Sequence, residues 1–117
     1  MSFMAVTIIK NMDERLQAVL EELHRQFEAL YGERLVQMML FGSRARGDAQ
    51  PESDFDVLVV LRGPVDAGEE ILRSGKVAAS LSLQFDVVLS RVFISAERFF
   101  TEQSPLLLNI RREGIRL

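Results

Sequence analysis

The chain has 117 residues, 48% of them hydrophobic and 26% charged, with a formal net charge of −3 at pH 7. This balance is typical of one globular domain and excludes disordered and low-complexity chains. The longest uncharged run is nine residues, below the roughly 20 that a membrane helix requires. We therefore expect a single domain over 1–117, without a signal peptide and located in the cytoplasm.

The acidic balance and the absence of cysteine restrict the possible ligands. Bulk binding of nucleic acid is not expected, because the chain has no basic excess. Without cysteine, and with His24 as its one histidine, the chain cannot form a thiolate or histidine-cluster metal site. Any metal must be held by oxygen, which favours hard cations such as Mg²⁺ or Mn²⁺.

The first half of the chain contains one long helical pattern and two strand patterns. Apolar residues recur at three- and four-residue steps over 13–30, which predicts an amphipathic helix that Asn11 or Asp13 caps. Strands are predicted over 35–41 and 55–61, and the polar segment between them has room for a short helix and a turn.

The second half alternates helices with one more strand. Helices are predicted over 66–83, 96–102 and 105–113, with Asp66, Ser95 and Ser104 as their caps. Gly75 weakens the first of these helices, which indicates a close packing contact there. The apolar run 85–89 predicts a third strand. The whole order predicts an α/β (α+β) fold, in which helices pack on a small mixed sheet.

Three acidic residues at strands form the most informative pattern. Asp54 and Asp56 are two positions apart at the start of the second strand, so both carboxylates lie on the same face. Asp86 interrupts the predicted third strand, where an unpaired buried carboxylate is costly. If the two strands are neighbours, the three carboxylates converge and can hold one or two divalent cations.

Gly42 and Ser43 supply a complementary site for phosphate. They stand where a strand ends and a short helix begins, so backbone N–H groups and the Ser43 hydroxyl can meet phosphate oxygens. Together with the carboxylate pair they form the element Gly-Ser-x10-Asp-x-Asp. Arg44 is a further candidate for phosphate binding, although a solvated role is equally consistent with its position.

The run Met39–Val60, MLFGSRARGDAQPESDFDVLVV, resembles the signature of the DNA polymerase beta-like nucleotidyltransferases. The similarity is to the minimal nucleotidyltransferase (MNT) branch and extends to Phe85–Val88 and Asn109–Ile115. It implies a polymerase beta-like nucleotidyltransferase core. Members of this branch act as antitoxins of small helical HEPN toxins, in some cases by transferring AMP from ATP to a tyrosine of the toxin.

Carried onto this sequence, the resemblance assigns a role to each motif residue. Gly42 and Ser43 would bind the triphosphate, and Asp54 and Asp56 would bind both metal ions. Asp86 would bind one metal ion and act as the base toward the acceptor hydroxyl. The expected function is Mg²⁺-dependent AMP transfer from ATP to a HEPN-type toxin, in a hetero-oligomeric toxin–antitoxin pair of the type VII kind.

Other interpretations remain open at the level of sequence. The Asp54–Asp56 pair could belong to a solvated turn, and Asp86 could form a structural salt bridge. The chain could neutralise its toxin by binding alone, without catalysis. A third alternative is a nucleotidyltransferase that modifies a small molecule such as an antibiotic.

Overall fold

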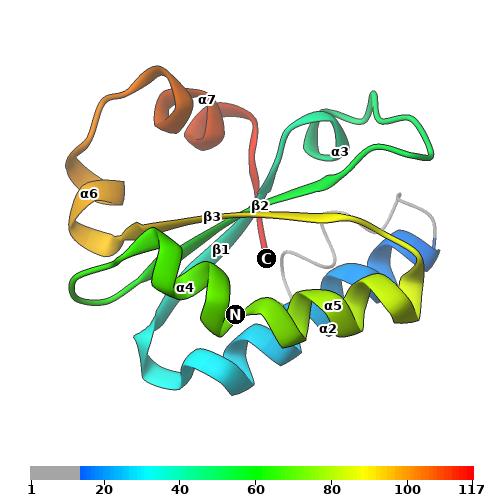
Figure 1. The fold of residues 1–117 in the computed structure, drawn as a ribbon. Coiled ribbons are helices and arrows are strands. Elements are labelled where there is room, and N and C mark those ends of the chain that lie inside the picture. Colours follow the sequence, from blue (N-terminus) through cyan, green and yellow to red (C-terminus); the bar gives the residue numbers. More distant parts are fainter. Residues whose placement is uncertain (1–13) are drawn as a thin grey trace.

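The computed structural model describes residues 14–117, which form a four-stranded sheet with helices on both faces (Figure 1). The helices are α2 (Glu14–Tyr31), α3 (Ser43–Arg46), α4 (Ala67–Arg73), α5 (Gly75–Phe85), α6 (Ala96–Thr101) and α7 (Pro105–Glu113), and a short 3-10 helix, η1 (Gly32–Arg34), follows α2. The strands are β1 (Leu35–Phe41), β2 (Phe55–Leu61), β3 (Leu89–Ser95) and β4 (Ile115–Arg116). None of the described helices is long and apolar enough to cross a membrane.

The sheet has the order β3-β2-β1-β4 and is mixed, as expected. β1 is antiparallel to both β2 and β4, whereas β2 and β3 are parallel. The parallel pair requires a crossover, which α4 and α5 provide. The short strand β4 pairs with Met39 and Leu40 and was not predicted, because two residues carry no recognisable strand pattern.

Two apolar clusters cover the two faces of the sheet. On one face, α2 and α5 pack against alternate residues of β2, including Phe55, Val57 and Val59. On the other face, α6 and α7 pack against Leu58 and Val60. Figure 1 shows these helix pairs on opposite sides of the sheet, with α3 on the side of α6 and α7. Since side chains alternate along a strand, Asp56 belongs to the face of α6 and α7.

The predicted long helix α2 is confirmed, and its buried stripe contains Val19, Leu20, Leu23, Phe27 and Tyr31. Its predicted caps, Asn11 and Asp13, lie outside the described residues. The caps of the last two helices are also confirmed. The Ser95 hydroxyl accepts a hydrogen bond from the N–H of Arg98 at 3.2 Å, and the Ser104 hydroxyl accepts one from the N–H of Leu107 at 3.4 Å.

The predicted helix 66–83 is instead two helices that meet at Ser74. The Ser74 side chain is fully buried and its hydroxyl donates to the Glu70 carbonyl at 2.8 Å, so the helix breaks around a satisfied polar group. The close packing predicted at Gly75 is wrong, because a Cβ added there would meet nothing within 4 Å.

The predicted strand 85–89 is also wrong. The helix α5 continues to Phe85, and Asp86 adopts a left-handed conformation (φ 54°, ψ 54°) that ends it. The third strand begins only at Leu89. A short apolar run does not distinguish a strand from a buried helix end, and Phe85 extends the apolar stripe of α5. Aspartate is one of the few residues that tolerate the left-handed conformation.

Candidate functional site

The turn after β1 is built on Gly42. Its backbone has φ 76° and ψ −157°, a conformation that is open essentially to glycine alone. Its carbonyl accepts hydrogen bonds from the N–H groups of Ala45 and Arg46, both at 3.1 Å, and so starts the short helix α3. A Cβ on Gly42 would overlap Oδ2 of Asp56 and lie 3.1 Å from its Cγ. Glycine is therefore required both for the turn and for the place of the Asp56 carboxylate.

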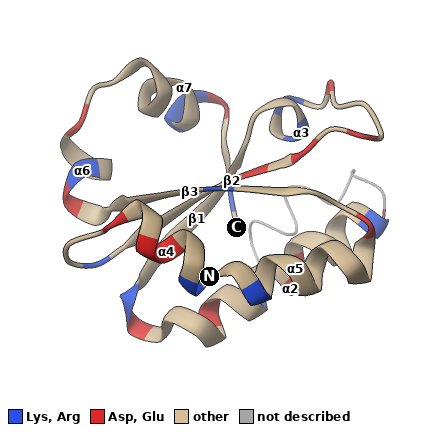
Figure 2. Cartoon of the chain, in the orientation of Figure 1, with Lys and Arg blue, Asp and Glu red and all other residues tan. Residues whose placement is uncertain are grey.

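Asp54 and Asp56 lie at the start of β2, beside this turn. The register pairs Asp56 with Phe41, the residue before Gly42, so the two motifs meet across one strand pair. Asp56 is half-buried, whereas Asp54 is exposed. Figure 2 shows acidic residues at this end of β2 and basic residues on the neighbouring helix α3. The Gly-Ser turn and the Asp-x-Asp pair therefore lie side by side at this end of the sheet.

The environment of Asp56 disfavours a negative charge. Burial raises the pKa of the Asp56 carboxyl above its ordinary value, the Asp54 carboxylate raises this pKa further, and the Arg46 guanidinium partly opposes the shift. A cation placed between the two carboxylates would reverse this effect and favour their ionised forms.

Arg44 does not point its charge at this turn. Its Nη2 donates to the carbonyls of Pro51 and Ser53, at 3.2 and 2.9 Å, and its guanidinium carbon lies 4.4 Å from the centre of the Phe55 ring. Arg44 thus holds the loop that leads into Asp54, and this arrangement gives no support to the phosphate contact predicted for it. Arg46 is the basic residue whose charge acts on Asp56, and sequence reasoning could not rank the two.

Asp86 does not join the other two carboxylates. It is exposed at the end of α5, outside β3, and the backbone carbonyls of Phe85 and Asp86 accept hydrogen bonds from the Arg15 side chain. The parallel register instead places Ser90 directly beside Asp56. Within residues 14–117, no three histidine or acidic side chains come together as a possible metal site. The expected convergence of three carboxylates is therefore wrong, because it assumed that Asp86 lies in the strand.

The remaining oxygen donors fit one hard cation. Asp54 directly precedes β2 and its charge acts on the Asp56 carboxyl. The absent side chain of Gly42 leaves room for the Asp56 carboxylate. Two carboxylates, with water and phosphate oxygens as further ligands, are the usual set for a nucleotide-bound Mg²⁺.

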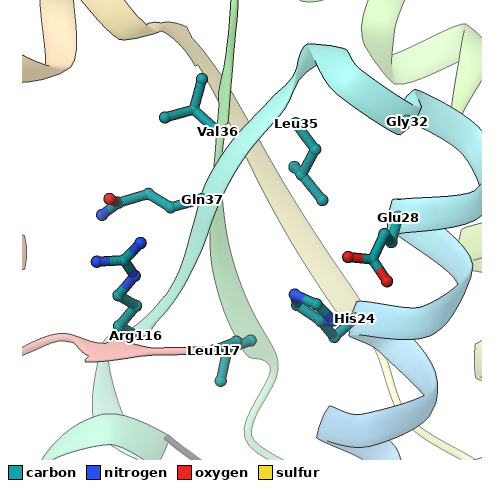
Figure 3. A pocket seen from close by; sticks show the side chains of 8 residues that line it. All are labelled: His24, Glu28, Gly32, Leu35, Val36, Gln37, Arg116 and Leu117. Atoms are coloured by element: carbon teal, nitrogen blue, oxygen red, sulfur yellow. The ribbon is translucent and has the colours of Figure 1, made fainter. Parts of the chain in front are cut away.

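A separate hollow of about 260 Å³ lies near the other end of β1 (Figure 3). It is lined by His24, Glu28, Gly32, Leu35, Val36, Gln37, Arg116 and Leu117. None of the predicted site residues lines it. It contacts the first three residues of β1, whereas Asp56 pairs with the last. The hollow and the carboxylate pair are therefore distinct features.

Comparison of the sequence with known proteins identifies its family. The family described as "Nucleotidyltransferase domain" matches residues 20–114. Two proteins of Methanocaldococcus jannaschii, both named "Putative protein adenylyltransferase", are similar to this chain. One is 31% identical over 63% of this chain and 74% of its own length, and the other is 34% identical over 71% and 77%.

Solved structures share the fold at lower sequence identity. A crystal structure of a toxin–antitoxin with AMP-PNP has a TM-score of 0.58 at 19% identity, and the match covers 85% of this chain and 69% of that chain. A mutant of the toxin–antitoxin MntA-HpeT has a TM-score of 0.54 at 20% identity, covering 83% and 70%. These likenesses show the expected polymerase beta-like nucleotidyltransferase fold.

Proposed function

The chain belongs to the nucleotidyltransferase family, and from this premise we propose that it transfers AMP from ATP to a hydroxyl of a partner protein. The acceptor we propose is a tyrosine of a HEPN-type toxin, which makes this chain the antitoxin of the pair. The observation that carries the proposal is the meeting of the Gly42–Ser43 turn with the Asp54–Asp56 pair across β1 and β2. The names of the two relatives support a protein as the acceptor, and the toxin–antitoxin structures with this fold support a toxin as the partner.

Each part of the site has a task in this reaction. The turn at Gly42 and Ser43 receives the triphosphate, because the first N–H groups of a helix lack partners within the helix. Asp54 and Asp56 hold the divalent cation, with Mg²⁺ as the expected ion and Mn²⁺ as the alternative. When bound, such a cation withdraws charge from the triphosphate and the leaving pyrophosphate. Arg44 keeps the loop before Asp54 in place through its two carbonyl contacts.

The transfer itself is a single displacement. The oxygen of the acceptor hydroxyl forms a bond to the α-phosphorus of ATP and its proton passes to solvent. The bond from this phosphorus to the bridging oxygen breaks, and pyrophosphate leaves with the electron pair. The nucleotide and the acceptor must lie in line for this exchange, so the site works mainly by positioning and by electrostatic stabilisation.

Transfer of label from ATP labelled at the α-phosphate tests the proposal. The protein is incubated with Mg²⁺, labelled ATP and a HEPN-type partner, and we expect label on the partner. The double variant Asp54→Asn, Asp56→Asn should lower this transfer by about 10²-fold or more, the scale of losing an electrostatic group in an active site. Glu52→Gln is the matched control, since Glu52 is an exposed carboxylate of the same loop. Equal transfer by the double variant would refute the proposal.

A second candidate function is neutralisation by binding alone, and the missing third carboxylate favours it. In this case the double variant still binds the toxin and still suppresses its activity. If catalysis is needed, the double variant binds the toxin without suppressing it. Co-purification and a toxin activity assay, carried out on the same complexes, distinguish these outcomes.

A further inference from the structure

Ser90 occupies the position on β3 that lies next to Asp56. The two strands are parallel and in register from the Phe55–Leu89 pair to the Leu61–Ser95 pair. Directly paired residues of neighbouring strands project to the same face, so Ser90 shares with Asp56 the face covered by α6 and α7. Val92 and Ile94, two and four residues further along β3, pack against the apolar cluster of that face, which confirms the assignment.

No acidic residue of the neighbouring segments supplies a carboxylate at the position of Ser90. Asp86 lies four residues before Ser90. Its left-handed backbone ends α5, and β3 begins only at Leu89. The contacts of Arg15 with the Phe85 and Asp86 carbonyls hold this end of α5 on the side of α2. The described residues bring no third acidic or histidine side chain to the Asp54–Asp56 pair.

We infer that the nucleotide site of this chain holds one divalent cation per nucleotide, on Asp54 and Asp56, and that Ser90 stands where a third carboxylate would hold a second cation. This inference rests on the proposed function and specifies the metal content of the same site. A serine hydroxyl is a weak neutral ligand, and hard divalent cations prefer carboxylates. A second cation would therefore have to share the two aspartates with the first.

Counting protein-bound Mn²⁺ tests this inference without measuring transfer. The chain is saturated with a non-hydrolysable ATP analogue, and bound Mn²⁺ is determined by equilibrium dialysis and by electron paramagnetic resonance. We expect one Mn²⁺ per bound nucleotide for the unaltered protein and for Asp86→Asn. Ser90→Asp should raise the count to two, whereas Ser90→Ala, the matched control, should leave it at one.

The other possible Mn²⁺ counts distinguish failure of this inference from failure of the proposed function. Two bound ions in the unaltered protein, falling to one in Asp86→Asn, would show that Asp86 is a ligand and would overturn the inference. A count of one in a folded Ser90→Asp variant would overturn the role given to Ser90. If Ser90→Asp fails to fold, the Mn²⁺ counts of the unaltered protein and of Asp86→Asn still test whether the site holds one cation. Nucleotide and Mn²⁺ binding that survives Asp54→Asn with Asp56→Asn would instead refute the proposed function, and the inference with it.

Discussion

At the scale of single residues, Gly42 connects the phosphate turn to the carboxylate pair. Its positive φ starts α3, and the space left by its missing side chain is filled by the Asp56 carboxylate. The backbone of the turn and the packing of the Asp56 carboxylate thus both require a glycine at position 42. The sequence motif indicates that a glycine belongs here, but only the contact with Asp56 shows that the turn and the carboxylate depend on each other.

Substitution of Gly42 should therefore cost more than backbone strain. Gly42→Ala is expected to lower the free energy of unfolding by more than the roughly 1–2 kcal/mol typical of a strained left-handed residue, and to weaken nucleotide binding. Gly63→Ala is the matched control, because Gly63 has the same φ of 76° and a Cβ there meets nothing within 4 Å. Urea unfolding and titration with an ATP analogue measure the two effects. Equal losses in both variants would contradict this explanation.

Residue type alone does not predict which of the two arginines of α3 acts on the site. Arg44 and Arg46 stand two apart in one short helix, and either could approach a phosphate. In the structure Arg44 is occupied by the carbonyls of Pro51 and Ser53, whereas the charge of Arg46 reaches Asp56. The direction of a long side chain depends on the loop that packs against it, which the local sequence does not specify.

At the scale of elements, the boundary between α5 and β3 decides which polar residues reach the site. The run 85–89 is apolar and β-branched enough for a strand, yet α5 extends to Phe85 because this side chain continues the helix stripe that packs on the core. Tertiary packing thus overrides strand propensity here. Shifting the strand to Leu89–Ser95 moves Asp86 away from the site and moves Ser90 into it.

Stability measurements on Asp86 can check this boundary. At φ 54° a glycine is favoured and a β-branched residue is not, so we expect Asp86→Gly to raise the free energy of unfolding by up to about 1 kcal/mol and Asp86→Val to lower it by a similar amount or more. Gln84→Gly, in the last turn of α5, should lower it by about 1 kcal/mol. The midpoints of urea unfolding report these changes. Were Asp86 in a strand, the order of the glycine and valine variants would be reversed.

At the scale of the whole molecule, the buried carboxylate of Glu70 joins elements at the end of the sheet opposite the site. Glu70, on α4, is 3% exposed. It accepts hydrogen bonds from the Tyr31 hydroxyl at 2.9 Å, from Arg73 at 2.9 Å and from Arg34 at 3.2 Å. These partners belong to α2, α4 and η1, so one side chain fixes the first helix against the crossover helices. Burial alone would raise the pKa of Glu70, but the three hydrogen bonds lower it below its ordinary value.

The lowered pKa of Glu70 predicts a pH dependence of stability. A carboxyl whose pKa is lower in the folded state stabilises the fold fully above its ordinary value of 4.5, and this contribution is lost as the pH falls through the lowered pKa. Glu70→Gln should therefore cost about 1–3 kcal/mol at pH 7 and progressively less below pH 4.5. Urea unfolding across this pH range measures both.

Glu69→Gln provides the control for this prediction. Glu69 is exposed on the same helix and its ion pair with Arg73 is solvated, so its loss should change the free energy of unfolding by less than about 1 kcal/mol at every pH. A difference between the unaltered protein and Glu70→Gln that stays constant from pH 7 to pH 3 would contradict the role given to Glu70.

The amino-acid sequence alone predicts the elements with strong periodicity and the chemistry of the local motif. Residues 14–31, 35–41 and 55–61 have patterns that only one secondary structure buries well. The Gly42-Ser43 and Asp54–Asp56 motifs lie close together in the sequence, from the end of the first strand to the start of the second. Which residue of the third strand lies beside Asp56 follows from the tertiary structure and not from the local sequence. That choice depends on the register between strands separated by two helices, and a shift of a few residues costs little in local propensity while it exchanges Asp86 for Ser90.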